Sequence, residues 1–186
     1  MTGKQLRPTD VKRLNRSWRR RTHGRIALLL ESVNSPFNVG SIARSAAAFG
    51  VQQVWLTGNA IAPDHPNARK TALGTERFMT WERTGKPGEA VDAAHEAGFH
   101  VVAVELTSDA QPLHEMTLTG DTCLAIGAED HGCSPGLLAA CDAAAYIPQV
   151  GRVGSLNVAV AAGVALAEVR RHEWAQPASG TPTDGR

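Results

Sequence analysis

The sequence predicts an α/β domain in which a mostly parallel sheet carries helices on both faces. Short apolar runs such as residues 26–30 contain no charged residue, which is typical of strands buried on both faces. Segments with helical periodicity stand between these runs, and strands that alternate with helices form mostly parallel sheets. The length of 186 residues and the hydrophobic content of 42% suit one domain with a sizeable core.

In the first half of the chain we expect strands at 26–30, 52–57 and 78–81 and helices at 38–49 and 87–97. In the first of these helices Val39, Ile42 and Ala46 recur on one face, and Gly50 ends the pattern. Residues 58–76 are polar and broken by prolines. They therefore form a loop or short helix of the length found in functional connections.

In the second half we expect strands at 100–106, 122–127 and 144–147 and helices at 134–141 and 155–174, with a long connection over 107–120. Ser134 followed by Pro135 has the chemistry of an N-cap and a first helical turn. The last helix consists almost entirely of small and apolar residues. That composition suits a buried helix that packs closely against its neighbours.

The charge is divided unevenly along the chain. Residues 1–25 hold nine of the 19 lysines and arginines and one of the 18 acids, a net charge of +8, which leaves −7 on the remainder. A basic arm on an acidic body fits a polyanion, most simply nucleic acid, and its RNA-binding candidates are Arg16, Arg19, Arg20 and Arg21. The alternative is a solvated, disordered leader.

The arm also contains a helical pattern at 10–21. Val11, Leu14 and Trp18 form a narrow apolar stripe that we expect to dock the helix on the body. These patterns divide the chain into an arm over 1–25, a domain over 26–175 and a Gly/Pro/Ser/Thr-rich tail over 176–186 that we expect to be disordered.

Several classes of protein are disfavoured. No apolar run approaches the roughly 18–20 residues of a membrane span, and the basic N-terminus lacks the pattern of a signal peptide. The three cysteines have no C-x-x-C spacing, which predicts a cytoplasmic protein without a zinc site. The glycine fingerprints of dinucleotide and phosphate binding and the G-x-S-x-G elbow are absent.

Three polar, glycine-containing segments each follow a predicted strand, at residues 31–44, 127–132 and 148–157. Ligands bind beyond the carboxyl ends of strands in open α/β sheets, so these segments are candidates for one site. Asn38 is either a helix cap or a site residue, and Arg44 is either a surface residue or a bidentate phosphate ligand. Glu129 is either a solvated turn residue or a group that orients a hydroxyl or Arg44.

Two further features belong to these segments. Gly127 allows a ligand to approach the backbone closely. Ser155 and Asn157 stand together at the start of the last helix and cannot both be caps, so we expect one of them to be free for a ligand.

Taken in order, the three segments resemble the motifs of the SPOUT superfamily of RNA methyltransferases, specifically its SpoU/TrmH branch. NSPFNVGSIAR resembles the first motif, IGAEDHG the second and IPQVGRVGSLNVAVA the third. The resemblance places five residues on signature positions: Asn38, Arg44, Glu129, Ser155 and Asn157. It implies a deep C-terminal trefoil knot, a homodimer and S-adenosylmethionine as the donor, with no metal. By the same analogy the backbone of Leu106, Gly127, Ile147 and Leu156 lines the donor pocket.

The resemblance further implies transfer of a methyl group to a ribose 2′-hydroxyl of RNA. We expect tRNA as the substrate, with a D-loop guanosine as the first candidate nucleotide. Ribosomal RNA, the wobble ribose and a non-catalytic RNA-binding dimer of the same fold are the alternatives. The family mechanism makes the arginine a proton acceptor, whereas the high pKa of arginine favours Arg44 as a phosphate clamp that also stabilises the developing alkoxide.

Overall fold

The computed structural model describes residues 3–118 and 120–175, so the tail predicted to be disordered lies outside the described residues. Within those ranges the strands form one seven-stranded sheet in the order β3-β2-β1-β6-β4-β7-β5, and each strand pairing in it is parallel. The strands are β1 (Ile26–Glu31), β2 (Gln53–Thr57), β3 (Thr80–Arg83), β4 (His100–Val104), β5 (Gln111–Pro112), β6 (Thr122–Ile126) and β7 (Ala143–Tyr146). The predicted α/β fold class is confirmed.

The helices agree with the predicted ones to within a few residues. They are α1 (Pro8–Arg19), α2 (Pro36–Phe49), α3 (Pro66–Ala72), α4 (Pro87–Glu96), α5 (Pro135–Ala140) and α6 (Val158–Ala175), with 3₁₀ turns at η1 (Thr75–Phe78) and η2 (Leu113–Glu115). The strand predicted at 78–81 begins two residues later, because η1 occupies Phe78. The last helix begins at Val158 and not at Ser155, which leaves Ser155 in the preceding loop.

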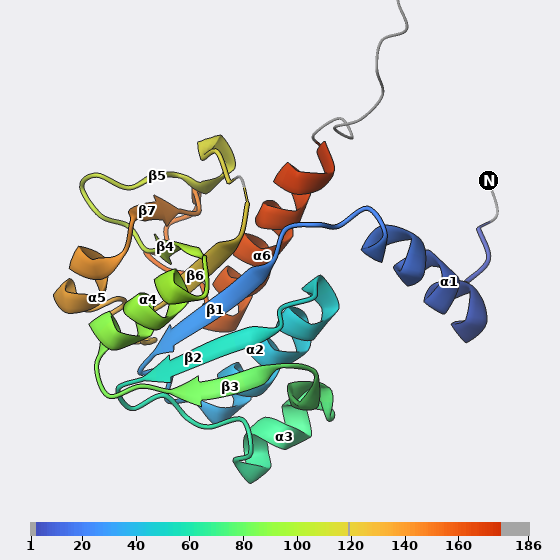
Figure 1. Ribbon diagram of the computed structural model, residues 1–186, viewed down its shortest axis with the longest axis horizontal. Coiled ribbons are helices and arrows are strands. Elements are labelled where there is room, and N and C mark those ends of the chain that lie inside the picture. Colours follow the sequence, from blue (N-terminus) through green and yellow to red (C-terminus); the bar gives the residue numbers. More distant parts are fainter. Residues whose placement is uncertain (1–2, 119, 176–186) are drawn as a thin grey trace, which may run out of the picture.

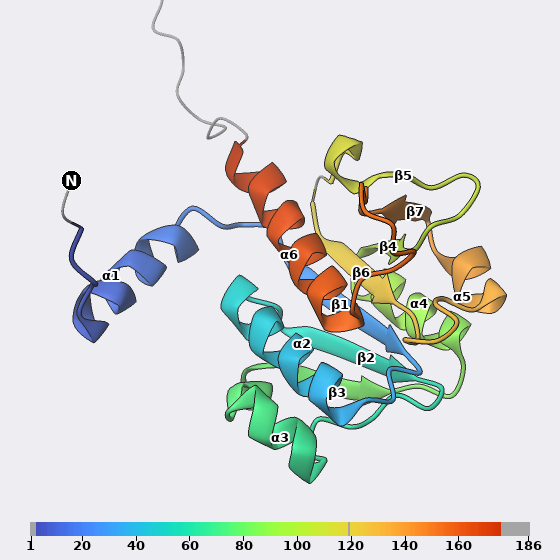
Figure 2. The same ribbon diagram turned by 180° about the vertical axis from the view of Figure 1, so that it is seen from behind.

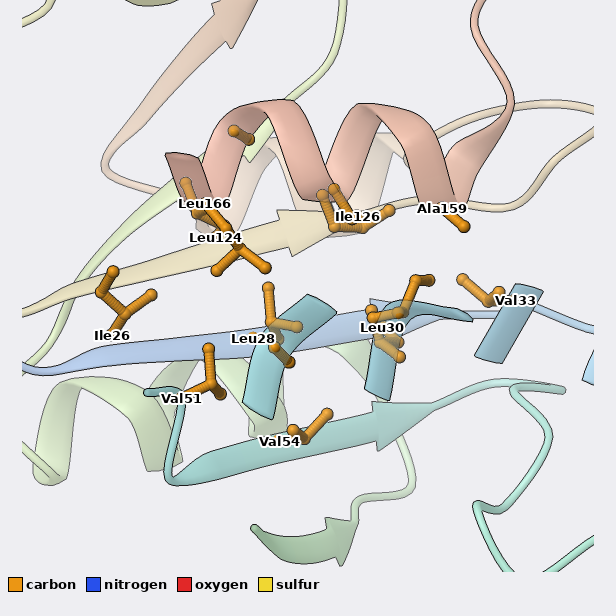
Figure 3. Packing of buried hydrophobic residues seen from close by; sticks show 14 of the residues in the cluster. Ile26, Leu28, Leu30, Val33, Val51, Val54, Leu124, Ile126, Ala159 and Leu166 are labelled. Carbon is orange, nitrogen blue, oxygen red and sulfur yellow. The ribbon is translucent and has the colours of Figure 1, made fainter. Parts of the chain in front are cut away.

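The core lies on both faces of the sheet. Along β1, Ile26, Leu28 and Leu30 face the layer of α2 and α6, whereas Ala27 and Leu29 face the layer of α4 and α5. Figure 3 shows the first group packed against Leu124 and Ile126 of β6 and against α6, and Figure 2 shows α2 and α6 side by side over that face. Every residue of β1 is buried, which explains why the strand is an unbroken apolar run that ends in Glu31.

Helix α1 projects away from the body (Figure 1). None of its residues is buried, and Val11 and Leu14 are 40% and 46% exposed. The prediction that the apolar stripe docks the helix on the body is therefore wrong for these two residues, because no element of the described chain packs over them. Near the C-terminal end of the helix, the Trp18 ring centroid lies 4.8 Å from that of Trp174 on α6 and attaches this end to the body.

The described residues contain neither a membrane-spanning helix nor a metal-binding cluster. None of their helices combines the length and the apolar character that a membrane crossing requires. Nor do residues 3–118 and 120–175 bring together three or more histidine, cysteine, aspartate or glutamate side chains in a way that would hold a metal ion.

Candidate active site

The three candidate segments meet at one edge of the sheet. Because the central strands β1, β6, β4 and β7 all run parallel, their carboxyl ends share that edge, and the loops that follow them lie next to one another. The loops after β1 and β6 carry the first two predicted motifs, and the loop after β7 leads into α6 with the third.

Asn38 connects all three segments through its side chain. Its Nδ2 donates a hydrogen bond to Oε1 of Glu129 over 2.9 Å, and its Oδ1 accepts one from Nδ2 of Asn157 over 3.1 Å. These partners are 91 and 119 residues away in the sequence. The fold therefore joins three of the predicted site residues into one hydrogen-bonded row.

The interpretation of Asn38 as the cap of α2 is wrong. Ser35 is the N-cap, and its Oγ accepts a hydrogen bond from the backbone N–H of Asn38. Pro36 occupies the first helical position, where its fixed φ and missing N–H suit the start of a helix. With the cap supplied by Ser35, the side chain of Asn38 is available to the neighbouring loops.

Glu129 holds the loop after β1 in place. Besides the bond from Asn38, its carboxylate accepts hydrogen bonds from the backbone N–H groups of Asn34 and Ser35, each over 3.3 Å. Partial burial works to raise the pKa of Glu129, but these hydrogen bonds outweigh it and hold the pKa below its ordinary value. Glu129 therefore orients the backbone of the loop after β1 and the side chain of Asn38. The sequence had left open that Glu129 orients Arg44, but the two side chains form no hydrogen bond or ion pair.

Asn157 and Ser155 divide the two roles expected at the start of α6. Oδ1 of Asn157 accepts hydrogen bonds from the N–H groups of Ala159 and Val160, so Asn157 is the cap as well as the partner of Asn38. Ser155 lines a cavity and forms no hydrogen bond with another residue that the structure describes. Its hydroxyl is therefore without a partner among the described residues, and its contact with a ligand stays a prediction.

The cavity has a volume of about 500 Å³, within the range of small-molecule sites. All four residues expected to line a donor pocket, Leu106, Gly127, Ile147 and Leu156, lie along it. Its wall also includes three carboxylates, those of Glu105, Glu129 and Asp130, and no lysine, arginine or histidine of the described chain. The cavity is therefore lined by apolar groups and by negative charge.

The need for glycine at position 127 is explained by the packing of its own loop and does not require the approach of a ligand. The loop after β6 folds back on itself, and Ala128 and Gly132 pair through two backbone hydrogen bonds of 3.0 Å. A Cβ atom on Gly127 would overlap the backbone of Gly132 and Cys133. Only glycine allows this tight return, which shapes one part of the cavity wall.

Two carboxylates that anchor this loop were missed by sequence reasoning. Glu31, only 5% exposed at the end of β1, accepts hydrogen bonds from the N–H and Oγ of Ser134 over 2.8 and 2.6 Å. Glu105, just after β4, accepts hydrogen bonds from the N–H groups of Leu106 and Cys133, each over 2.9 Å. A glutamate that closes or directly follows a buried apolar run was the signal that could have identified both.

The predicted arginines lie outside the cavity wall. Arg44 is exposed on α2 and makes no hydrogen bond or ion pair with any residue in the described ranges. Arg16, Arg19 and Arg20 are exposed at the end of the arm, and the guanidinium of Arg21 lies 4.6 Å from the Trp18 ring centroid. Neither Arg44 nor the arm arginines therefore line the cavity.

The fold and this edge define an α/β protein whose candidate ligand site is built from the loops after its central parallel strands. The family model of the SpoU rRNA methylases matches residues 25–167, and the chain belongs to this family. The predicted family is confirmed. The C-terminal trefoil knot that the family implies stays a prediction for this chain.

Named relatives act on two kinds of RNA. The chain is 36% identical over 154 residues to a tRNA (guanosine(18)-2′-O)-methyltransferase of Thermus thermophilus, which covers 82% of this chain and 77% of the relative. It is 35% identical over 147 residues to a 23S rRNA (guanosine-2′-O-)-methyltransferase of Acinetobacter baylyi, which covers 78% of this chain and 59% of the relative.

Solved structures agree with the family assignment. An AdoMet-bound rRNA methyltransferase from Sinorhizobium meliloti superposes with a TM-score of 0.75 at 30% identity, over 81% of this chain and 57% of that one. The chain therefore spans less than two thirds of the length of several of the proteins that it matches.

Proposed function

We propose that the protein transfers a methyl group from S-adenosylmethionine to a ribose 2′-hydroxyl of RNA, with tRNA as the substrate. The observation that carries the proposal is a cavity lined by carboxylates and apolar side chains. It lies beside the hydrogen-bonded side chains of Asn38, Glu129 and Asn157. Relatives at about 35% identity are named as ribose methyltransferases of tRNA and of rRNA, which supports the same chemistry.

The cavity suits this donor better than a phosphorylated cofactor. S-Adenosylmethionine carries a positive sulfonium, and three carboxylates with no basic group in the described wall favour a positive ligand. A nucleotide phosphate would meet these carboxylates and no basic side chain of the described wall. Leu106, Ile147 and Leu156 offer apolar surface for a flat base. When bound, the donor supplies an electrophilic methyl group.

The residues of the chain then have to bring the ribose to that group and orient it. The 2′-oxygen would form a bond to the methyl carbon as the bond from that carbon to the sulfonium sulfur breaks. The sulfur would keep that electron pair as a neutral thioether, and the hydroxyl proton would pass to solvent water. Positioning of this kind lowers a barrier by several kcal/mol without a covalent step on the protein. Ser155 has a hydroxyl free at the cavity, and the row of Asn38, Glu129 and Asn157 fixes the loops around it.

Neither Arg44 nor Glu129 suits the role of a strong general base. A guanidinium holds its proton too tightly to accept another, and the lowered pKa of Glu129 makes its carboxylate a weak proton acceptor near neutral pH. We assign Arg44 to a backbone phosphate of the RNA, which its exposed guanidinium can bind by two parallel hydrogen bonds. From that position it stabilises the developing alkoxide.

Within this proposal residues 26–175 form the catalytic domain and the basic arm over 1–25 contacts RNA. The similarity to the Thermus thermophilus enzyme favours a D-loop guanosine of tRNA. The similarity to the Acinetobacter baylyi enzyme makes a guanosine of 23S rRNA the second candidate. Three free cysteine thiols support a reducing, cytoplasmic setting for this reaction.

We further propose a homodimer in which α6 is part of the interface. Val160 and Val164 lie one turn apart on α6 and are 52% and 42% exposed. An apolar pair of this kind on a helix that otherwise packs closely fits a contact with a second copy. The exposed Phe37 at the start of the neighbouring α2 extends the same apolar character.

The test is labelled methyl transfer from S-adenosylmethionine to separate pools of tRNA and ribosomal RNA, followed by mapping of the modified nucleotide. We expect label in tRNA at the 2′-oxygen of one guanosine. Label only in rRNA would move the substrate to the second candidate. Absence of donor binding by calorimetry at millimolar concentration would replace the enzyme by a non-catalytic RNA-binding dimer.

A further inference from the structure

We propose that Glu105 is a positioning residue that fastens together two segments of the donor cavity, a role that rests on the proposed function. Its carboxylate is the link between the loop after β4 and the loop after β6. Both loops line the cavity. They are far apart in the chain, so non-covalent contacts have to hold them at a fixed distance from each other.

The geometry of Glu105 gives each oxygen its own partner. Oε1 accepts a hydrogen bond from the N–H of the adjacent Leu106, and Oε2 accepts one from the N–H of Cys133, 28 residues along the chain. Leu106 is one of the cavity-lining residues, and Cys133 ends the loop that contains Gly127 and Glu129. One side chain therefore fixes the backbone of both segments.

The loop after β6 is shaped to admit this carboxylate. Gly132 has a left-handed backbone with φ of +69°, and a Cβ atom there would overlap Oε2 of Glu105. A side chain at position 132 would thus be strained by its backbone conformation and would also displace the carboxylate. The glycine and the glutamate are two halves of one contact.

The contact depends on the negative charge of Glu105. A carboxylate accepts N–H bonds more strongly than a neutral oxygen does, and Glu105 uses both of its oxygens. A glutamine at this position keeps the shape but has only one acceptor oxygen, so one N–H loses its partner. Because Cys133 is buried, water cannot readily replace that partner.

Glu31 is the comparison that distinguishes a residue that positions the cavity wall from one that only stabilises the fold. It also accepts hydrogen bonds from the end of this loop, but its partner Ser134 caps α5 and does not line the cavity. Removal of the Glu31 hydrogen bonds should therefore lower stability first. Removal of the Glu105 hydrogen bonds should change the cavity itself.

The experiment measures the affinity for S-adenosylmethionine by calorimetry, the Tm, and amide exchange at Cys133. For Glu105→Gln we expect about tenfold weaker donor binding, the size of one missing charge-assisted hydrogen bond. We also expect faster exchange at Cys133 and RNA affinity within twofold of wild type. Glu115→Gln, at an exposed glutamate outside the cavity, is the matched control and should bind the donor as wild type does.

Gly132→Ala attacks the same contact from the opposite side and should imitate Glu105→Gln. In the double variant the two decreases in affinity should not add, since one contact cannot be broken twice. The inference is overturned if Glu105→Gln binds the donor like wild type, or if the two decreases add fully. Should Glu105→Gln fail to fold, Gly132→Ala with wild-type donor affinity overturns it equally. Wild-type protein that does not bind the donor at all would instead contradict the proposed function.

Discussion

Nδ2 of Asn157 donates a hydrogen bond to Oδ1 of Asn38 over 3.1 Å, across 119 residues of sequence. The same Asn157 caps α6 with its Oδ1, so one amide group serves both the last helix and the site. The fold of the third segment and the geometry of the first are therefore coupled through a single side chain.

The two roles of Asn157 can be separated by substitution. Asn157→Asp keeps an oxygen to cap α6 but cannot donate to Asn38, so we expect a Tm close to wild type and a large loss of methyl transfer. Asn157→Ala loses the cap as well, at a cost of about 1 kcal/mol, and its Tm should fall by about 2–4 °C. Equal Tm values for the two variants would show that the cap contributes nothing.

Arg44→Ala should lower methyl transfer by about 100-fold or more, the loss typical of removing one group that stabilises developing charge. Donor affinity should stay unchanged, because Arg44 is not part of the cavity wall. The measurement is single-turnover transfer at saturating RNA, with calorimetry for the donor. Arg77→Ala, at another exposed arginine, is the control, and near wild-type turnover of Arg44→Ala would refute the clamp.

Replacing Arg16, Arg19 and Arg20 together by glutamine should weaken RNA binding and flatten its dependence on salt. For each phosphate that the arm no longer neutralises, the slope of log affinity against log salt should fall by about one unit. These three side chains are exposed, and Trp18 and its packing against Trp174 are left in place, so the arm should stay attached. An unchanged slope would assign the arm to another role.

Low pH should lower the stability of the folded protein because Glu129 becomes protonated. Its pKa in the folded protein lies below the ordinary value of 4.5, so the unfolded state binds the proton first and stability falls as pH falls. The contribution of Glu129 is complete above about pH 4.5 and is lost as the pH falls through the lowered pKa. The Tm difference between wild type and Glu129→Gln should therefore shrink between pH 6 and about pH 3. A constant difference would contradict the assignment.

Val160→Asp should convert the proposed homodimer into monomers, because a carboxylate buried without a partner at an apolar contact is strongly unfavourable. Sedimentation velocity measures the change directly. Glu96→Asp, on α4 at the opposite face of the sheet, serves as the control. A wild-type protein that sediments as a monomer would exclude the interface.

The order of the longer strands and helices was predictable because each of them carries its own signal, whereas the two-residue β5 lies in the segment 107–120 that was expected to be a connection. Residues 26–30 are continuously apolar since both faces of β1 are covered, and Ser134-Pro135 begins α5 by local capping chemistry. Errors arose where the chain offered two local solutions. Ser35 and Asn38 both suit a cap, and only the packing of the loop after β6 assigns Asn38 to Glu129.

The sequence by itself determined the fold class, the family and the three segments that form the site, because periodicity, capping and motif order are local properties. Tertiary structure alone decided which side chains meet. Glu31 and Glu105 became anchors only because β1, β4 and β6 are neighbours in the sheet, and Asn157 rather than Ser155 became the cap. Hydrogen bonds act over about 3 Å, so contacts between residues 28 to 119 positions apart exist only once the strands have aligned their ends.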